Sequence, residues 1–291
     1  MPVSFQSPTM KAALDLSPWS WFYWLLHSFF IISVLESCHA VPIVGGRIVS
    51  TVGSSTSKYP FMVSLEDVIT GNTTSGVSYQ HFCGGSLISD RWILSAAHCV
   101  WRKNIHNIAA FIGYENIENI GQLEPYGLES VEYIYFQPSN FRNDIALLYM
   151  KRRYWSDFGN GLQYAQLPPH GMKPDQNESC RIIGYGATHH AGPCQKKLFE
   201  AEVRVIDNQK CRDIIGHIWA PQNGANTVCA LGNNQDSCQG DSGGPLICPY
   251  GGKDYIYGLV SHGLTCGIPG MPSIYTVTRP YYDWVQLLMQ S

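Results

Sequence analysis

Apolar residues that follow Arg47 gather in short runs separated by turn-forming residues. The runs are rich in Val, Ile, Tyr and Leu, and Gly, Pro, Asn and Asp lie between them at close intervals. Runs of this length and spacing predict β-strands, and many of them together favour an all-β barrel or sandwich. The clearest predicted strands are residues 61–66, 92–95, 179–184, 201–206 and 255–261.

One helix is predicted, at the C-terminal end of the chain. Tyr281, Trp284, Val285 and Leu288 are spaced i, i+3, i+4 and i+7, which places four apolar side chains on one helical face. Pro280 stands just before them, as is common at a helix start. We expect this helix to pack on the β-structure.

The N-terminal segment has the features of a signal peptide. Residues 19–35 are apolar except for His27 and a few Ser, and Cys38-His39-Ala40 follows with the small-x-small pattern of a cleavage site. The run is shorter than the roughly 20 residues of a membrane span. We therefore predict a signal peptide over 1–40 and a secreted protein, with a start at Met10 or an uncleaved signal anchor as the alternatives.

Composition agrees with an extracellular protein. The chain has 291 residues, 10 Cys and a net charge of -3, and glycosylation triplets begin at Asn72 and Asn177. Cysteine-rich chains with such triplets suit an oxidising compartment. The basic residues are scattered, so we expect no nucleic-acid partner.

Three segments carry the residues of a nucleophilic site. Gly240-Asp241-Ser242-Gly243-Gly244-Pro245 places one hydroxyl in a glycine-rich turn that brings backbone amides close to a ligand. His98 lies in Ser95-Ala96-Ala97-His98-Cys99, and Asp144 stands before an apolar run. The order His, Asp, Ser along the chain is one of the known orders of a Ser-His-Asp triad.

These segments, with Phe82-Cys83-Gly84-Gly85 and Asp236-Ser237-Cys238-Gln239, resemble the chymotrypsin/trypsin family of serine proteases over residues 48–291. The resemblance implies an all-β fold of two packed six-stranded antiparallel β-barrels with a C-terminal helix. It also implies a serine endopeptidase without a cofactor, in which Ser242 is the nucleophile, His98 the base and Asp144 the group behind it. The amides of Gly240 and Ser242 would form the oxyanion hole, and Ser261 would support Asp144.

The resemblance also implies a set of disulfides. Family pairing would join Cys83 with Cys99, Cys180 with Cys248, Cys211 with Cys229, and Cys238 with Cys266. Cys38 would leave with the signal peptide. Cys194 then has no family partner, and we predict a free thiol there, with an intermolecular link as the alternative.

Specificity for Arg or Lys before the scissile bond is implied by Asp236, which stands where trypsin-like members carry the acid of the primary pocket. Gly263 keeps the open pocket entrance of the family. Two residues depart from the pattern, because Ser273 replaces a wall glycine and His262 replaces a Trp. We expect Ser273 to narrow the slot and the loss of the indole to remove apolar surface from the non-primed subsites.

A precursor with a short propeptide, residues 41–47, is expected by the same resemblance, and the cut is predicted between Arg47 and Ile48. The new ammonium group of Ile48 would pair with Asp241 and order the Gly240 amide. A rival start, Ile43-Val44-Gly45-Gly46, looks more like the family's usual terminus. We favour Ile48 because Arg47 is a trypsin-type target and only Ile48 has the family's spacing to Tyr59-Pro60-Phe61.

The expected partners are protein or peptide substrates, an activating protease and a protein inhibitor, with no membrane partner. We predict no metal, because Tyr114 stands where the family's calcium loop would need an acidic ligand. The loop between Leu65 and Cys83 is longer than in plain trypsin. Two alternatives stay open: a catalytically silent homologue that binds a partner, and a membrane-anchored protease.

Overall fold

The computed structural model describes residues 43–49, 57–70, 76–154, 163–174, 179–190, 192–222 and 226–290. All of them belong to the larger of two compact units, Cys38–Ser291. The predicted signal peptide and both predicted glycosylation sites, Asn72 and Asn177, lie outside the described residues.

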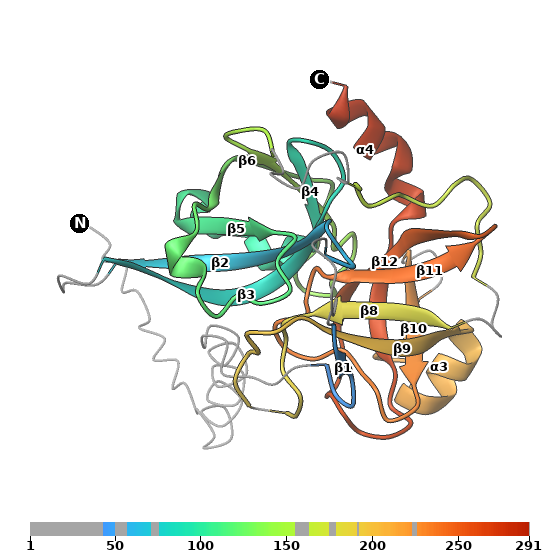
Figure 1. Ribbon diagram of the computed structural model, residues 1–291. Helices are drawn as coiled ribbons and strands as arrows, with labels where there is room; N and C mark the ends of the chain where they lie inside the picture. Colours follow the sequence, from blue (N-terminus) through green and yellow to red (C-terminus); the bar gives the residue numbers. More distant parts are fainter. Residues whose placement is uncertain are drawn as a thin grey trace, which may run out of the picture. The chain divides into compact units, whose positions relative to one another are not determined.

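Six antiparallel strands in the first half of this unit close into a barrel, in the order β2-β3-β4-β7-β6-β5 (Figure 1). They are β2 (Met62–Thr70), β3 (Val77–Leu87), β4 (Trp92–Ser95), β5 (Ile108–Ile112), β6 (Tyr126–Tyr133) and β7 (Ala146–Met150). Every second residue of a strand points inward, and Val63, Leu65, Ile93 and Leu148 are among the inward residues buried in its core.

The second half forms a second antiparallel barrel. Its strands are β8 (Cys180–Gly184), β9 (Phe199–Ile206), β10 (Thr227–Gly232), β11 (Pro245–Tyr250), β12 (Lys253–His262) and β13 (Ser273–Val277). The pairing of β8 with β9 closes the ring, and the short strand β1 (Arg47–Ile48) adds to the outside of it by pairing with β9. The predicted fold of two six-stranded barrels is therefore confirmed.

The predicted C-terminal helix is also confirmed, as α4 (Tyr282–Met289), which follows a 3-10 turn at Arg279–Tyr281 (Figure 1). Tyr281 and Val285 are buried in a hydrophobic cluster that the side chains of Trp284 and Leu288 also contact. The opposite face, with Leu287, is exposed.

Two further helices connect the strands. Helix α2 (Ala97–Val100) follows β4, and α3 (Asn208–Ile215) follows β9. The side chain of Asp207 accepts a hydrogen bond from the Lys210 amide and so caps α3. The sequence did not indicate α3, because Cys211 and Ile215 are its only buried residues and two apolar positions make too short a stripe.

The long segment between Leu65 and Cys83 extends the β2–β3 hairpin. The two strands pair as far out as Thr70 opposite Val77. The described fold contains no helix that is long and apolar enough to cross a membrane.

Candidate active site

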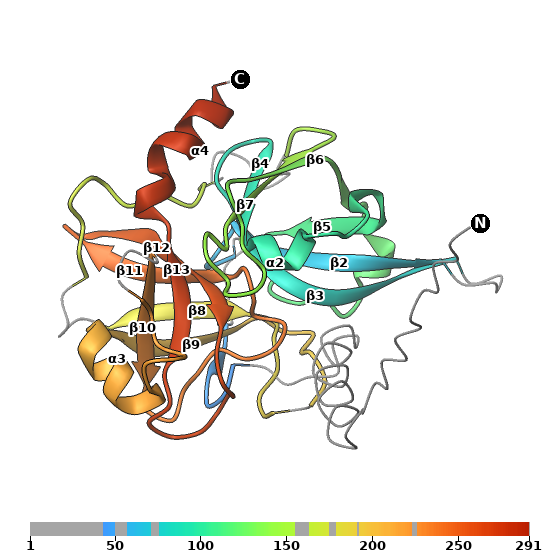
Figure 2. The ribbon, with the colours of Figure 1, turned by 180° about the vertical axis from the view of Figure 1, so that it is seen from behind.

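Two of the three predicted triad residues are joined directly. His98 lies on α2 (Figure 2), and its Nδ1 is 2.8 Å from Oδ2 of Asp144. The backbone amide of His98 donates to the other carboxylate oxygen, also at 2.8 Å. Because an ionised carboxylate only accepts, Nδ1 carries the proton. The lone pair of Nε2 is thereby available to accept a proton from a nucleophile.

Asp144 is fully buried, and its charge is compensated on all sides. Ser261 Oγ donates to Oδ2 at 2.5 Å. Burial by itself would raise the pKa of Asp144, but the neighbouring His98 and the hydrogen bonds from His98 and Ser261 outweigh burial and lower that pKa. The carboxylate is therefore ionised at neutral pH and fixes the orientation of the His98 ring.

His262 extends this chain of hydrogen bonds. Its Nδ1 is 3.0 Å from Ser261 Oγ, and because the Ser261 proton is given to Asp144, Nδ1 of His262 is the donor. Burial lowers the pKa of His262 to about 4, so its ring is neutral at neutral pH. The ring also stacks on Phe141, whose edge in turn meets His98.

Phe141 is a site residue that the sequence did not reveal. It contacts both histidines with ring centroids 5.5 Å and 4.7 Å away, and it adopts a left-handed backbone with φ 54°. That conformation is uncommon for a residue with a bulky side chain. Nothing in the local sequence indicates it, since Phe141 lies in a polar turn.

The predicted nucleophile lies in a tight turn between Cys238 and β11. Gly243 has φ 76°, and a Cβ there would lie 2.2 Å from Ser95 Oγ and 2.6 Å from the Gly84 carbonyl oxygen. Only glycine fits. The amides of Asp241, Gly243 and Gly244 donate to carbonyls, whereas no hydrogen bond from the amides of Gly240 and Ser242 is recorded within the described part of the chain.

In the described structure, no hydrogen bond joins Ser242 Oγ to His98 Nε2, although both residues contact Cys99. Cys99 Sγ lies 3.8 Å from Nε2 of His98 and 3.6 Å from the Ser242 carbonyl oxygen. Catalytic hydrogen bonds are often long in free enzymes and tighten when substrate binds. A hydrogen bond between Ser242 Oγ and His98 Nε2 that forms when substrate binds therefore stays a prediction.

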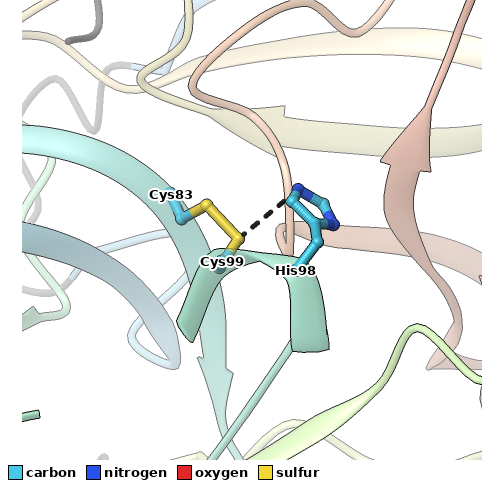
Figure 3. A group of neighbouring side chains, drawn as sticks. All are labelled: Cys83, His98 and Cys99. Atoms are coloured by element: carbon cyan, nitrogen blue, oxygen red, sulfur yellow. Dashed lines mark hydrogen bonds between the residues drawn. A yellow bond between two sulfur atoms is a disulfide. The ribbon is translucent and has the colours of Figure 1, made fainter. Parts of the chain in front are cut away.

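Figure 3 shows the sulfurs of Cys83 and Cys99 beside the His98 ring. Three ligand-type atoms of these residues lie within 4.8 Å of one another, a spacing that could hold a metal. The two sulfurs are joined in a disulfide, so they offer no thiolate. The disulfide therefore links α2 to strand β3.

Comparison with known proteins decides the family. A family model described as "Trypsin" matches residues 48–285, which include the histidine, aspartate and serine segments above. The chain belongs to the trypsin family.

Two curated relatives illustrate the range of this family. The chain is 30% identical over 264 residues to human "Serine protease 56", covering 84% of this chain and 39% of that protein, so it spans about two fifths of that relative's length. It is 30% identical over 263 residues to "Chymotrypsin-like elastase family member 1" of Felis catus, covering 88% of this chain and 94% of the relative.

The predicted specificity acid of this trypsin-family protein is buried and already has a partner. Ser273 Oγ donates to Asp236 Oδ1 at 2.6 Å, and the Gly267 amide lies 3.4 Å from Oδ2. Burial raises the pKa of Asp236 to about 6, although these hydrogen bonds oppose the rise. Gly263 lies next to Ser273, since a Cβ built on it would be 3.2 Å from Ser273 Oγ.

Among the described residues, no hydrogen bond or ion pair joins the predicted activation residues Ile48 and Asp241. Asp241 is buried, accepts from the amides of Gly186 and Cys238 at 2.9 Å each, and has no ion pair with a described residue. Burial raises its pKa to about 7. Ile48 is 49% exposed in β1, whereas Ile43 is fully buried, and Val44 pairs with Asp236 through two backbone hydrogen bonds.

The four disulfides implied by the family resemblance are all present: Cys83–Cys99, Cys180–Cys248, Cys211–Cys229 and Cys238–Cys266. The predicted free thiol at Cys194 is wrong, because Cys194 is itself disulfide-bonded. The family pattern offered no partner for it, so a pairing particular to this chain could not be foreseen.

Proposed function

We propose that this trypsin-family protein is an active serine endopeptidase that cuts after Arg or Lys through an acyl-enzyme on Ser242. The observation that carries the activity is the buried Asp144, which holds His98 with Nδ1 protonated and Nε2 ready to accept a proton. The observation that carries the specificity is the acid Asp236 at a buried position of the second barrel.

Each proposed step uses groups of this chain. Nε2 of His98 takes the Ser242 proton while Oγ attacks the scissile carbonyl carbon, and the cation that forms is stabilised by Asp144. The oxyanion accepts hydrogen bonds from the amides of Gly240 and Ser242. His98 then gives its proton to the leaving amine, and an acyl-enzyme is left. Water attacks this ester by the same steps and releases Ser242.

Asp236 would bind the cationic side chain that precedes the cut. An ionised carboxylate in a buried pocket strongly favours a cation over a neutral group. Ser273 competes for one of its oxygens, which supports a restrained rather than a digestive enzyme. The relative named as a chymotrypsin-like elastase makes a specificity other than Arg or Lys the rival proposal.

We further propose that the enzyme is a secreted precursor glycosylated at Asn72 and Asn177, with an activating protease and a protein inhibitor as partners. The exposed Arg47 side chain supports a cut between Arg47 and Ile48. The rival start at Ile43 also has support, because Ile43 is buried and Val44 is paired with the pocket residue Asp236. N-terminal sequencing of the active form decides between them.

A catalytically silent homologue is the second candidate. It is favoured by one observation, the lack of a recorded hydrogen bond between Ser242 Oγ and His98 Nε2 in the described structure. Reaction of the processed protein with a fluorophosphonate probe, with Ser242→Ala as the control, separates the two. Labelling of the wild type alone supports the protease, and no labelling, or equal labelling of both proteins, supports the silent homologue.

The specificity is tested with a positional peptide library, measured before and after trypsin treatment. We expect cleavage after Arg and Lys only after treatment, and we expect Asp236→Ser to abolish the preference. A wild type that cuts best after Ala, Leu or Phe would refute the assignment of Asp236 to an Arg/Lys pocket.

A further inference from the structure

A hydrogen-bonded array of buried polar side chains lies on two strands of the first barrel, outside the predicted active site. Ser64 and Glu66 alternate on β2, and His81 stands opposite Glu66 on β3. Ser64 and Glu66 are fully buried and His81 is 2% exposed. Ser64 Oγ lies 2.5 Å from Glu66 Oε1 and 2.7 Å from His81 Nδ1.

At one end of this array, His81 contacts the turn that holds the predicted nucleophile. His81 Nε2 is 2.8 Å from the Gly240 carbonyl oxygen. A carbonyl only accepts, so Nε2 must carry a proton and donate it. The tautomer of His81 is therefore fixed by the contact, and it leaves Nδ1 to interact with Ser64.

The number of protons shared within this array decides whether its short contacts are hydrogen bonds. With two protons shared among Glu66, Ser64 and His81 Nδ1, both short contacts are hydrogen bonds, whether the pair is a carboxylate with an imidazolium or a carboxylic acid with an imidazole. With one proton fewer, one of the two contacts would join two acceptors and repel. Glu66 therefore keeps the array complete, and the Nε2 proton of His81 stays on the Gly240 carbonyl in both forms.

Such an array is costly unless it has a use. Burying an acid and an imidazole requires large desolvation energies that hydrogen bonds only partly return. The expense is visible here, since Glu66 Oε2 is buried with no hydrogen-bond partner in the described structure. The rings of Tyr185 and His81 pack edge to face beside the array.

The contact falls on a residue that has little stiffness of its own. Gly240 has φ 90°, and glycine passes easily between backbone conformations. Its amide is one of the two that we assign to the oxyanion, and its carbonyl is the atom that His81 holds. Fixing the carbonyl restrains the ψ angle of Gly240, which is one of the two backbone rotations that relate the carbonyl to the Gly240 amide.

We propose that Glu66 and Ser64 are positioning residues that hold the Nε2 proton of His81 on the Gly240 carbonyl and thereby keep the Gly240 amide directed at the oxyanion. The proposal rests on the proposed protease function. It assigns a kinetic role to three buried side chains that belong neither to the predicted triad nor to the predicted specificity pocket.

The test compares buried hydroxyls and donors on one hairpin. Ser64→Ala breaks the array, whereas Ser86→Ala removes a fully buried hydroxyl of the same hairpin that has no recorded partner. Removing one oxyanion donor costs about 100- to 1000-fold in kcat, so loosening one should cost about tenfold. We expect Ser64→Ala and Glu66→Leu to lower kcat about tenfold with KM unchanged, and Ser86→Ala to leave both constants as they are.

Conservative variants separate positioning from packing. Glu66→Gln, which can still donate to Ser64, should recover most of the kcat lost in Glu66→Leu, and His81→Gln should exceed His81→Leu for the same reason. Affinity for a peptide boronate, which occupies the oxyanion hole, should fall with kcat, while affinity for benzamidine stays constant. Equal losses in Ser64→Ala and Ser86→Ala, or equal losses of boronate and benzamidine affinity, overturn the proposal.

A measurement on the inactive Ser242→Ala protein keeps the two proposals distinguishable. Long-range 15N–1H spectra of the His81 ring should show a proton on Nε2 that exchanges slowly, and adding Ser64→Ala should speed the exchange at least tenfold. A wild type that hydrolyses nothing refutes the protease function, whereas fast exchange at Nε2 in Ser242→Ala refutes the positioning array.

Discussion

The hydroxyl of Ser273 should set the pH at which the Arg/Lys pocket becomes charged. Its hydrogen bond to Asp236 Oδ1 is 2.6 Å long and favours the carboxylate. A hydrogen bond to a charged group contributes about 1.5 to 3 kcal/mol, and one pKa unit corresponds to about 1.4 kcal/mol. Ser273→Gly should therefore raise the pKa of Asp236 from about 6 by about one to two units.

The assay is the dissociation constant of benzamidine, measured by calorimetry on the Ser242→Ala protein so that the nucleophile plays no part. Binding of this cation requires ionised Asp236, so below the pKa the constant should rise about tenfold per pH unit. The wild-type pocket should begin to lose affinity near pH 6, and Ser273→Gly near pH 7 to 8. At pH 9 the variant should bind several-fold more tightly, because the cation no longer competes with the hydroxyl.

Ser237→Ala is the matched control. Ser237 follows Asp236 in the sequence and is also buried. Its hydroxyl forms a hydrogen bond with the Tyr275 hydroxyl rather than with the Asp236 carboxylate. We expect the midpoint to stay near pH 6 in this variant. An unchanged midpoint in Ser273→Gly, or an equal change in Ser237→Ala, would refute the control of Asp236 by Ser273.

Three further predictions concern the nucleophile, the precursor and Asp241. Ser242→Ala should lower kcat at least about 10⁴-fold with substrate binding retained, measured with an Arg ester. Arg47→Gln should block activation by trypsin, and the active wild type should begin Ile-Val-Ser-Thr by sequencing; a sequence beginning Ile-Val-Gly-Gly would assign the terminus to Ile43 instead. In the uncleaved chain the raised pKa of Asp241, about 7 against an ordinary 3.8, lowers the free energy of unfolding by about 3 kcal/mol as pH rises from 4 to 7. Denaturant titrations should show that Asp241→Asn removes this loss, and an unchanged pH slope would contradict it.

Much of the fold could be predicted because local pattern and packing agree. The run Trp92–Ser95 is strand β4 over the same four residues, and the apolar face around Val285 is the buried face of α4. Disulfide partners came from the family resemblance, and where that gave no guidance, at Cys194, the prediction was wrong. Spacing along the chain says nothing about a partner that only tertiary structure supplies.

The sequence indicates which residues form the candidate site but not what surrounds them. His98, Asp144 and Ser242 are indicated by short motifs, whereas the contacts of Phe141 depend on a left-handed turn that no motif encodes. Ser64 alternates with the core residues Val63 and Leu65 on β2, so the sequence pattern predicts a solvent-facing position for it. Its burial together with Glu66 is supplied by tertiary packing. The hydrogen bond from Ser273 to Asp236 joins residues 37 positions apart, and only the closed second barrel brings them together.

The carbonyl of Ser242 accepts a hydrogen bond from the Gly84 amide at 2.8 Å. This bond ties the predicted nucleophile of the second barrel to a strand of the barrel that carries the predicted base. An enzyme divided between Met150 and Cys180 would thus yield two fragments, each with part of the machinery. If the two fragments were fused to two interacting proteins, hydrolysis would return only when the fragments reassemble. Reassembly would have to restore the hydrogen bond from the Gly84 amide to Ser242. The same bond crosses between the barrels. A chimera in which one barrel comes from a distant relative would therefore need residues that reform this contact.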